Sequence, residues 1–196
     1  MEKSKFTRSI VETGLLIALA VILSFIQVPF IFGAQITLAS TLPIFIICFR
    51  EEKGWGFLSA FLFSVIQLTI GIVRDGLLGY GLISSALFGC IALDYLIAFT
   101  MIGISSFFKN NREKGMIFGI FLSFFLRYVC HVLSGFLIFS NLEQWSLFGK
   151  IFENKAILYS VCFNAAHLVP EFIITTIAFL AVTRIPYLSE KIFVKK

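Results

Sequence analysis

Long apolar runs separated by short polar breaks make up almost all of this 196-residue chain. A helix needs about 20 apolar residues to cross the hydrocarbon core of a bilayer. The alternation of apolar and polar positions that a membrane barrel requires is absent, which leaves helices as the spanning elements. The pattern therefore predicts an all-α membrane protein with six transmembrane helices, over residues 10–30, 35–49, 54–73, 82–108, 115–139 and 156–183.

The second run, 35–49, is shorter than the others. At about 1.5 Å per residue it would cross only part of the bilayer, so we expect it to begin inside the outer half of the membrane. The apolar loop before it, residues 30–35, contains Gly33. This loop fits a lid over a site and a plain interfacial turn about equally well.

Basic residues predict the orientation of the bundle. Lys and Arg gather in the breaks on the side that also holds both termini, and cytoplasmic loops typically carry such an excess. We therefore predict cytoplasmic N and C termini, which require an even number of spans. The net charge of +5 is spread over loops and does not follow one face, so nucleic acid is not expected as a partner.

Composition leaves room for a single integral membrane domain over residues 1–196. Hydrophobic residues make up 59% of the chain and charged residues 14%, against roughly 25% charged residues in a soluble domain. The four cysteines lie in apolar runs without a CxxC pair, so we interpret them as packing residues and expect neither a disulfide nor a metal site. The P-loop motif is also absent, so transport driven by ATP would need a separate ATPase.

Ionisable side chains inside the predicted spans are costly to bury and are commonly functional. Asp94 lies midway along the fourth span and is followed by Tyr95. A carboxylate at that depth needs a cation, a hydrogen-bond donor or water. Asp94 therefore fits a ligand-binding group in a cavity, with a structural pair to Arg127 of the fifth span as the alternative.

A stripe of four residues runs along the fifth span. Arg127, His131, Gly135 and Phe139 recur every four positions and so share one helix face. His131 offers a donor and an acceptor, Gly135 leaves room for a flat ring, and Phe139 can stack on that ring. A packed core histidine and a close helix contact at the glycine are the alternatives. Arg127 is assigned chiefly to structure, as the partner of a buried acid.

The sixth span carries Tyr159, Asn164, His167 and Glu171. Asn164 and His167 are three residues apart and share a face, and the Asn164 amide supplies both donors and an acceptor. We interpret His167 and Glu171 as helix-packing residues in preference to ligand contacts. Glu171 is also a second acid that could pair with Arg127.

These residues give the chain a resemblance that covers nearly its whole length. It resembles the thiamine-specific substrate-binding subunits, the ThiT family, of energy-coupling factor (ECF) transporters. The order and spacing of the matching stretches are more specific than any single stretch. They are Leu42–Phe45 with Phe49-Arg50, Leu93–Phe99, Leu126–Tyr128 with His131 and Ser134-Gly135, and Tyr159-Ser160 with Asn164 and Val169-Pro170.

The resemblance implies a six-helix bundle with a thiamine pocket near the outer face, and a transport subunit that is not an enzyme. It implies an acid–tyrosine pair for the charged vitamin, a histidine for the pyrimidine with a glycine beside the ring, a stacking aromatic, and a tyrosine and asparagine from the last helix. In this sequence these are Asp94, Tyr95, His131, Gly135, Phe139, Tyr159 and Asn164.

The resemblance also implies partners. The small residues Gly14 and Ala18 of the first helix map to the surface that docks on the ECF transmembrane coupling subunit, which works with two ATPase subunits in the bacterial cell membrane. Internal helix packing is the alternative for these two residues.

Three positions depart from other members of the family. Some members carry Trp in the first external loop and at the stacking position, where this chain has Ala34 and Phe139, and Glu in place of Asp94. These differences bear on specificity and affinity more than on the class of substrate.

The chemistry of the residues agrees with thiamine, because a buried carboxylate among aromatics suits a thiazolium cation joined to a flat ring. Three alternatives stay open: a subunit for a related heterocycle such as hydroxymethylpyrimidine or pyridoxine, a stand-alone secondary transporter, and an intramembrane enzyme using His131 and Asp94. A missing inverted repeat argues against the second, and a missing HExxH or serine-based motif argues against the third.

Overall fold

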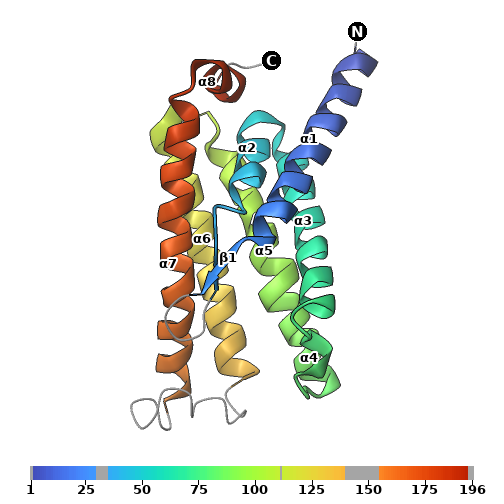
Figure 1. Cartoon of the computed structure of the whole chain (residues 1–196), viewed down its shortest axis with the longest axis vertical. Coiled ribbons are helices and arrows are strands. Elements are labelled where there is room, and N and C mark those ends of the chain that lie inside the picture. Colours follow the sequence, from blue (N-terminus) through green and yellow to red (C-terminus); the bar gives the residue numbers. More distant parts are fainter. Residues whose placement is uncertain (1, 30–34, 111, 140–154, 194–196) are drawn as a thin grey trace.

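The helices of this protein form one elongated bundle (Figure 1), seen in a computed structural model that describes residues 2–29, 35–110, 112–139 and 155–193. In chain order the elements are α1 (Glu2–Phe25), β1 (Gln27–Pro29), β2 (Gln35–Thr37), α2 (Leu42–Arg50), α3 (Lys53–Val73), η2 (Leu77–Gly79), α4 (Ser84–Cys90), η3 (Ile91–Ile97), α5 (Ala98–Thr100), η4 (Met101–Phe108), α6 (Arg112–Leu137), α7 (Ala156–Thr183) and α8 (Pro186–Phe193).

Five helices of the described residues are long and apolar enough to cross a bilayer: Phe6–Phe25, Lys53–Val73, Ser84–Phe108, Glu113–Leu137 and Ala156–Thr183. The predicted helix over 35–49 is present only from Leu42 on. Its first residues form strand β2, and α2 has only nine residues, about 14 Å of helix against a hydrocarbon core of about 30 Å.

The local sequence explains why α2 is short. Ala39 has a positive φ of 54°, which interrupts any helix at that point. Pro43 lies in the first turn of α2, where a missing N–H costs nothing. Six of the nine residues of α2 are buried, so this helix packs inside the bundle.

The chain also contains a β-hairpin, which corrects the prediction of an all-α fold. β1 and β2 pair antiparallel, with Val28 opposite Ile36. The hairpin leads from α1 to α2, and β2 contacts α7. Residues 30–34, where the lid was predicted, lie outside the described residues; of that loop only Gln35 is described.

The fourth long helix, Ser84–Phe108, is continuous but irregular. It begins as α-helix in α4, widens to a π-helix over Ile91–Ile97, and tightens to a 3₁₀-helix over Met101–Phe108. π-helical turns are rare and are frequently found at functional sites. Asp94 and Tyr95 both lie in the π-helical stretch.

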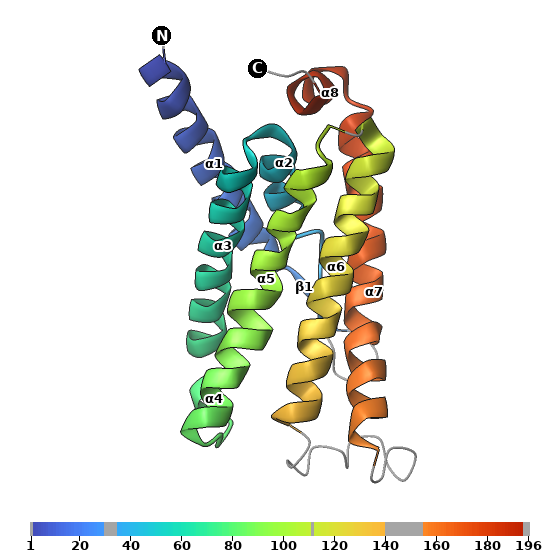
Figure 2. The ribbon, with the colours of Figure 1, turned by 180° about the vertical axis from the view of Figure 1, so that it is seen from behind.

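Both termini lie at the same end of the bundle, as Figure 2 also shows from behind. This agrees with the prediction that both termini lie on one side, while the number of six spans stays a prediction. The assignment of this end to the cytoplasm stays a prediction. The C-terminal helix α8 was not predicted; it lies at this end with Ile192 buried and Tyr187 exposed.

Stacked phenylalanines fill the bundle near α2. The ring of Phe45 stacks on Phe49 and on Phe124, with centroids 6.3 and 6.0 Å apart, and Phe49 lies 5.4 Å from Phe179. The apolar core therefore joins α2, α6 and α7. Asp94 follows α4, which Figure 1 places near the opposite end of the bundle.

Candidate functional site

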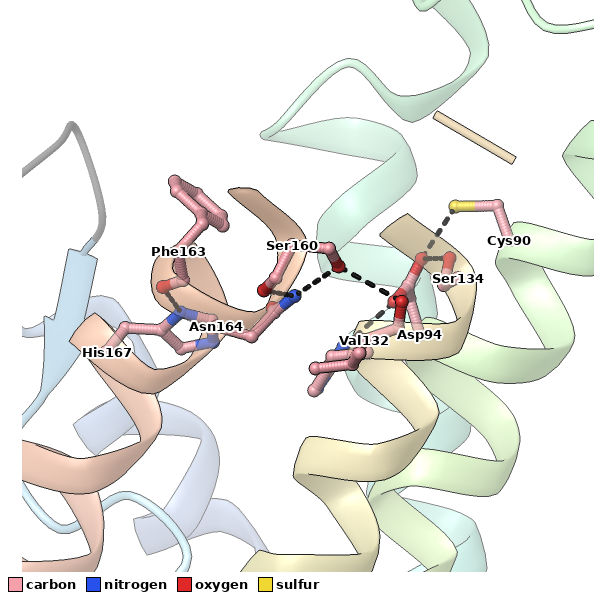
Figure 3. A network of polar contacts seen from close by, with 9 residues as sticks. Cys90, Asp94, Val132, Ser134, Ser160, Phe163, Asn164 and His167 are labelled. Carbon is pink, nitrogen blue, oxygen red and sulfur yellow. Dashed lines mark hydrogen bonds and ion pairs between the residues drawn. The ribbon is translucent and has the colours of Figure 1, made fainter. Parts of the chain in front are cut away.

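Asp94 lies at the centre of a polar cluster between η3 and α6. His131 Nδ1 is 2.8 Å from Asp94 Oδ1. Ser134 Oγ donates to Oδ2, and Cys90 Sγ lies 3.3 Å from the same oxygen (Figure 3). Each carboxylate oxygen therefore has a partner, which offsets the cost of placing the group among apolar helices.

The carboxylate also orients the imidazole of His131. An ionised carboxylate only accepts hydrogen bonds, so the ring nitrogen that faces it carries the proton. In the neutral ring this leaves Nε2 as an acceptor. The side chains of His131 and Asp94 keep 13% and 19% of their surface exposed, so the pair is only partly buried.

A second cluster joins α6 to α7. Ser160 Oγ donates to the Val132 carbonyl at 3.0 Å, and Asn164 Nδ2 donates to the Ser160 carbonyl at 2.9 Å (Figure 3). A Cβ placed on Gly135 would collide with Ser160 Oγ and lie 3.8 Å from Asn164 Nδ2. Gly135 therefore permits a close approach of the two helices, the packing alternative raised by the sequence.

Aromatic rings continue the site along α7. Tyr159 stacks on Phe163 at 5.6 Å, and Phe163 meets His167 edge-on at 5.8 Å. His167 in turn meets His131 edge-on, with centroids 6.0 Å apart. His167 Nδ1 donates to the Phe163 carbonyl at 3.3 Å. This run of rings connects Tyr159 of α7 to His131 of α6.

The other two predicted residues lie at the edges of the cluster. Phe139 meets Tyr80 edge-on at 6.5 Å, next to the end of α6. Burial raises the pKa of the Tyr80 phenol, which therefore stays protonated and neutral at physiological pH. Tyr95 packs against Gly71 of α3, where a Cβ would collide with its ring. The structure thus turns Tyr95 toward α3, while Asp94 faces α6.

Arg127 pairs with Glu171, which resolves the choice of acid that the sequence left open. Arg127 Nη1 lies 3.7 Å from Glu171 Oε2, and the two side chains are 4% and 7% exposed. Thr37 of β2 donates to Glu171 Oε1 from its backbone N–H at 3.1 Å and from its hydroxyl.

Sequence reasoning missed Ser134, Ser160 and Cys90 as members of the polar clusters. Two of them carried a usable signal, because Ser134 is three residues after His131 and Cys90 four before Asp94, each on the same helix face. Cys90 was interpreted as a packing residue. Ser160 bonds across to α6, and helix register alone gives no such contact.

The small residues of α1 lie outside the bundle. Gly14 and Ala18 are both exposed, and a Cβ on Gly14 would meet nothing within 4 Å. Ala20, by contrast, is fully buried. Internal packing, the alternative for Gly14 and Ala18, is therefore not seen among the described residues, which leave both positions exposed.

A sequence model of the family described as thiamine transporter protein matches residues 10–189. The chain belongs to this family. The family resemblance expected from the polar motifs is thereby confirmed. With its five long apolar helices, this member of the family is a multi-pass protein of the bacterial plasma membrane.

Two relatives illustrate the match. The thiamine transporter ThiT of Bacillus subtilis (strain 168) is 28% identical over 192 residues, which cover 90% of this chain and 91% of that protein. A solved structure of ThiT from Listeria monocytogenes has a TM-score of 0.67 at 21% identity, over 94% of this chain and 98% of that one. The second comparison supports the fold.

Proposed function

We propose that this chain is the thiamine-binding S component of an ECF-type importer, which captures thiamine with high affinity at the outer face of the membrane. The main observation in favour of this proposal is that no Lys or Arg of the described residues pairs with Asp94. Arg127, the candidate partner in the sequence, pairs with Glu171 instead. Among the described residues, the part-buried Asp94 carboxylate is bonded by His131, Ser134 and Cys90 and by no Lys or Arg, so its charge stays available for a cationic ligand.

The neighbouring groups suit the rest of thiamine. Nε2 of His131 can accept from the exocyclic amine of the aminopyrimidine, and the oxygen of Asn164 adds an acceptor nearby. The rings of Tyr159 and Phe139 supply flat apolar surface for the two heterocycles. Asp94 then faces the thiazolium charge, and the ring of Tyr95 closes the side toward α3 as a further expected contact.

Delivery across the membrane requires partners. The sequence lacks a P-loop, so ATP hydrolysis belongs to separate subunits, which we propose are an ECF transmembrane coupling subunit and two ATPases. The exposed face at Gly14 and Ala18 lets a helix of the coupling subunit approach closely.

Calorimetric titration of the purified protein tests the substrate and the role of Asp94. We expect thiamine to bind more tightly than hydroxymethylpyrimidine or pyridoxine, and Asp94→Asn to weaken thiamine binding by about ten-fold or more, because a charge-assisted contact is lost. Asp75→Asn removes an exposed acid beside Arg74 and serves as the matched control, with affinity unchanged. If Asp94→Asn binds thiamine as tightly as wild type, Asp94 does not contact the ligand. If pyridoxine binds more tightly than thiamine, thiamine is not the substrate.

A further inference from the structure

Two rows of side chains face each other between α6 and α7. His131 and Arg127 are one turn apart on α6, and His167 and Glu171 are one turn apart on α7. His131 meets His167, and one turn further toward the end with the termini Arg127 meets Glu171. The ion pair therefore lies one helical turn from the imidazole that contacts Asp94, on the side of the termini.

Arg127 is held by charge and by ring faces, with few hydrogen bonds. Its guanidinium lies 4.4 Å from the ring centroid of Phe99 and 5.3 Å from that of Phe124. The 3.7 Å contact with Glu171 is an ion-pair distance, too long for a hydrogen bond, and Nε and Nη1 have no hydrogen-bond partner among the described residues. Glu171 is thus the group that balances this buried positive charge.

Glu171 is itself fixed from a third element. Both hydrogen bonds from Thr37 go to Oε1, which leaves Oε2 directed to Arg127. The hairpin strand β2 therefore holds the carboxylate in position against the guanidinium.

We propose that Glu171 is a positioning residue that reserves Asp94 for the cation of the ligand by neutralising Arg127. This inference rests on the proposed function. Without Glu171, the positive charge of Arg127 is unbalanced and lies one helical turn from His131. It then repels the thiazolium cation and offsets part of the attraction between that cation and Asp94. A ligand with the same pyrimidine but no positive charge is not subject to that competition.

The charge of the ligand provides the test. The affinities of thiamine and of neutral hydroxymethylpyrimidine are measured by calorimetry on purified wild-type and variant proteins. Glu171→Gln should weaken thiamine on the order of ten-fold, as expected for a unit charge roughly 10 Å away at an effective dielectric of about 20, and should change hydroxymethylpyrimidine much less. A purely structural role for Glu171 would weaken both ligands equally, and that result would overturn the proposal.

Two further variants complete the design. Arg127→Gln combined with Glu171→Gln removes both charges and should restore the ratio of the two affinities toward the wild-type value; a ratio as low as in Glu171→Gln alone would contradict the proposal. Thr37→Val removes the hydroxyl bond to Glu171 but leaves the carboxylate charge and the bond from the Thr37 N–H, so it should change the ratio less than Glu171→Gln does; a change as large as in Glu171→Gln would contradict a role for the charge of Glu171. If wild-type protein fails to bind thiamine, the proposed function fails first, which separates the two outcomes.

Discussion

Gly135 illustrates how a single residue serves both packing and site. Its missing side chain lets Ser160 of α7 approach α6, and the same contact carries Asn164 toward the polar cluster. The sequence left a space for a ligand ring and a close helix contact as alternatives, because a glycine on a stripe is compatible with both. The neighbour that makes the close contact, Ser160, comes from another helix, and the space for a ligand ring stays a prediction.

Gly135→Ala should therefore lower the free energy of unfolding by about 1–3 kcal/mol, since the added methyl collides with Ser160. Thermal unfolding in detergent, read by loss of helical circular dichroism, measures the change. Gly14→Ala is the matched control, because its Cβ meets nothing within 4 Å and alanine favours the helix. Equal melting temperatures for wild type and Gly135→Ala would show that the contact is not tight.

The polar residues of the site could be picked out singly from the sequence, but not their pairings. Asp94 and His131 stand out because ionisable groups are rare in apolar runs. Two acids were available to Arg127, and helix register does not relate residues on different helices. Only the placement of α7 beside α6 assigns Glu171 to Arg127.

At the scale of elements, hydropathy located the long helices and failed at the second run. Residues 54–73 and 156–183 were predicted within a residue of α3 and α7. The run 35–49 is just as apolar, but a strand pairing with β1 and a positive φ at Ala39 divide it. A window of hydrophobicity detects neither, because both depend on backbone geometry.

The exposed small residues of α1 are predicted to contact the coupling subunit. Ala18→Leu should reduce thiamine uptake several-fold in cells that contain the coupling and ATPase subunits, because bulk on a small-residue face blocks close helix approach. Thiamine binding by the purified variant should match wild type. Leu19→Phe adds bulk on another exposed face and should leave uptake unchanged. Normal uptake by Ala18→Leu would place the docking surface elsewhere.

In the whole molecule, composition predicted the membrane class and the basic residues predicted that both termini lie on one side. The apolar composition required a membrane protein, and the even number of passages follows from placing both termini on one side. Five of the six predicted spans correspond to long apolar helices of the described residues, whereas the second, predicted as a short one, corresponds to strand β2 and the nine-residue helix α2. The match to a solved ThiT structure agrees with this helix arrangement, in which the polar clusters lie between η3, α6 and α7.

We propose that this chain binds thiamine without its partner subunits. Native mass spectrometry of the purified wild-type protein, incubated with thiamine and released gently from detergent, tests it most directly. We expect a species heavier than the bare chain by the mass of one thiamine, and a smaller share of that species in Asp94→Asn. A spectrum that shows only the bare chain at excess thiamine would rule out thiamine binding by this chain alone.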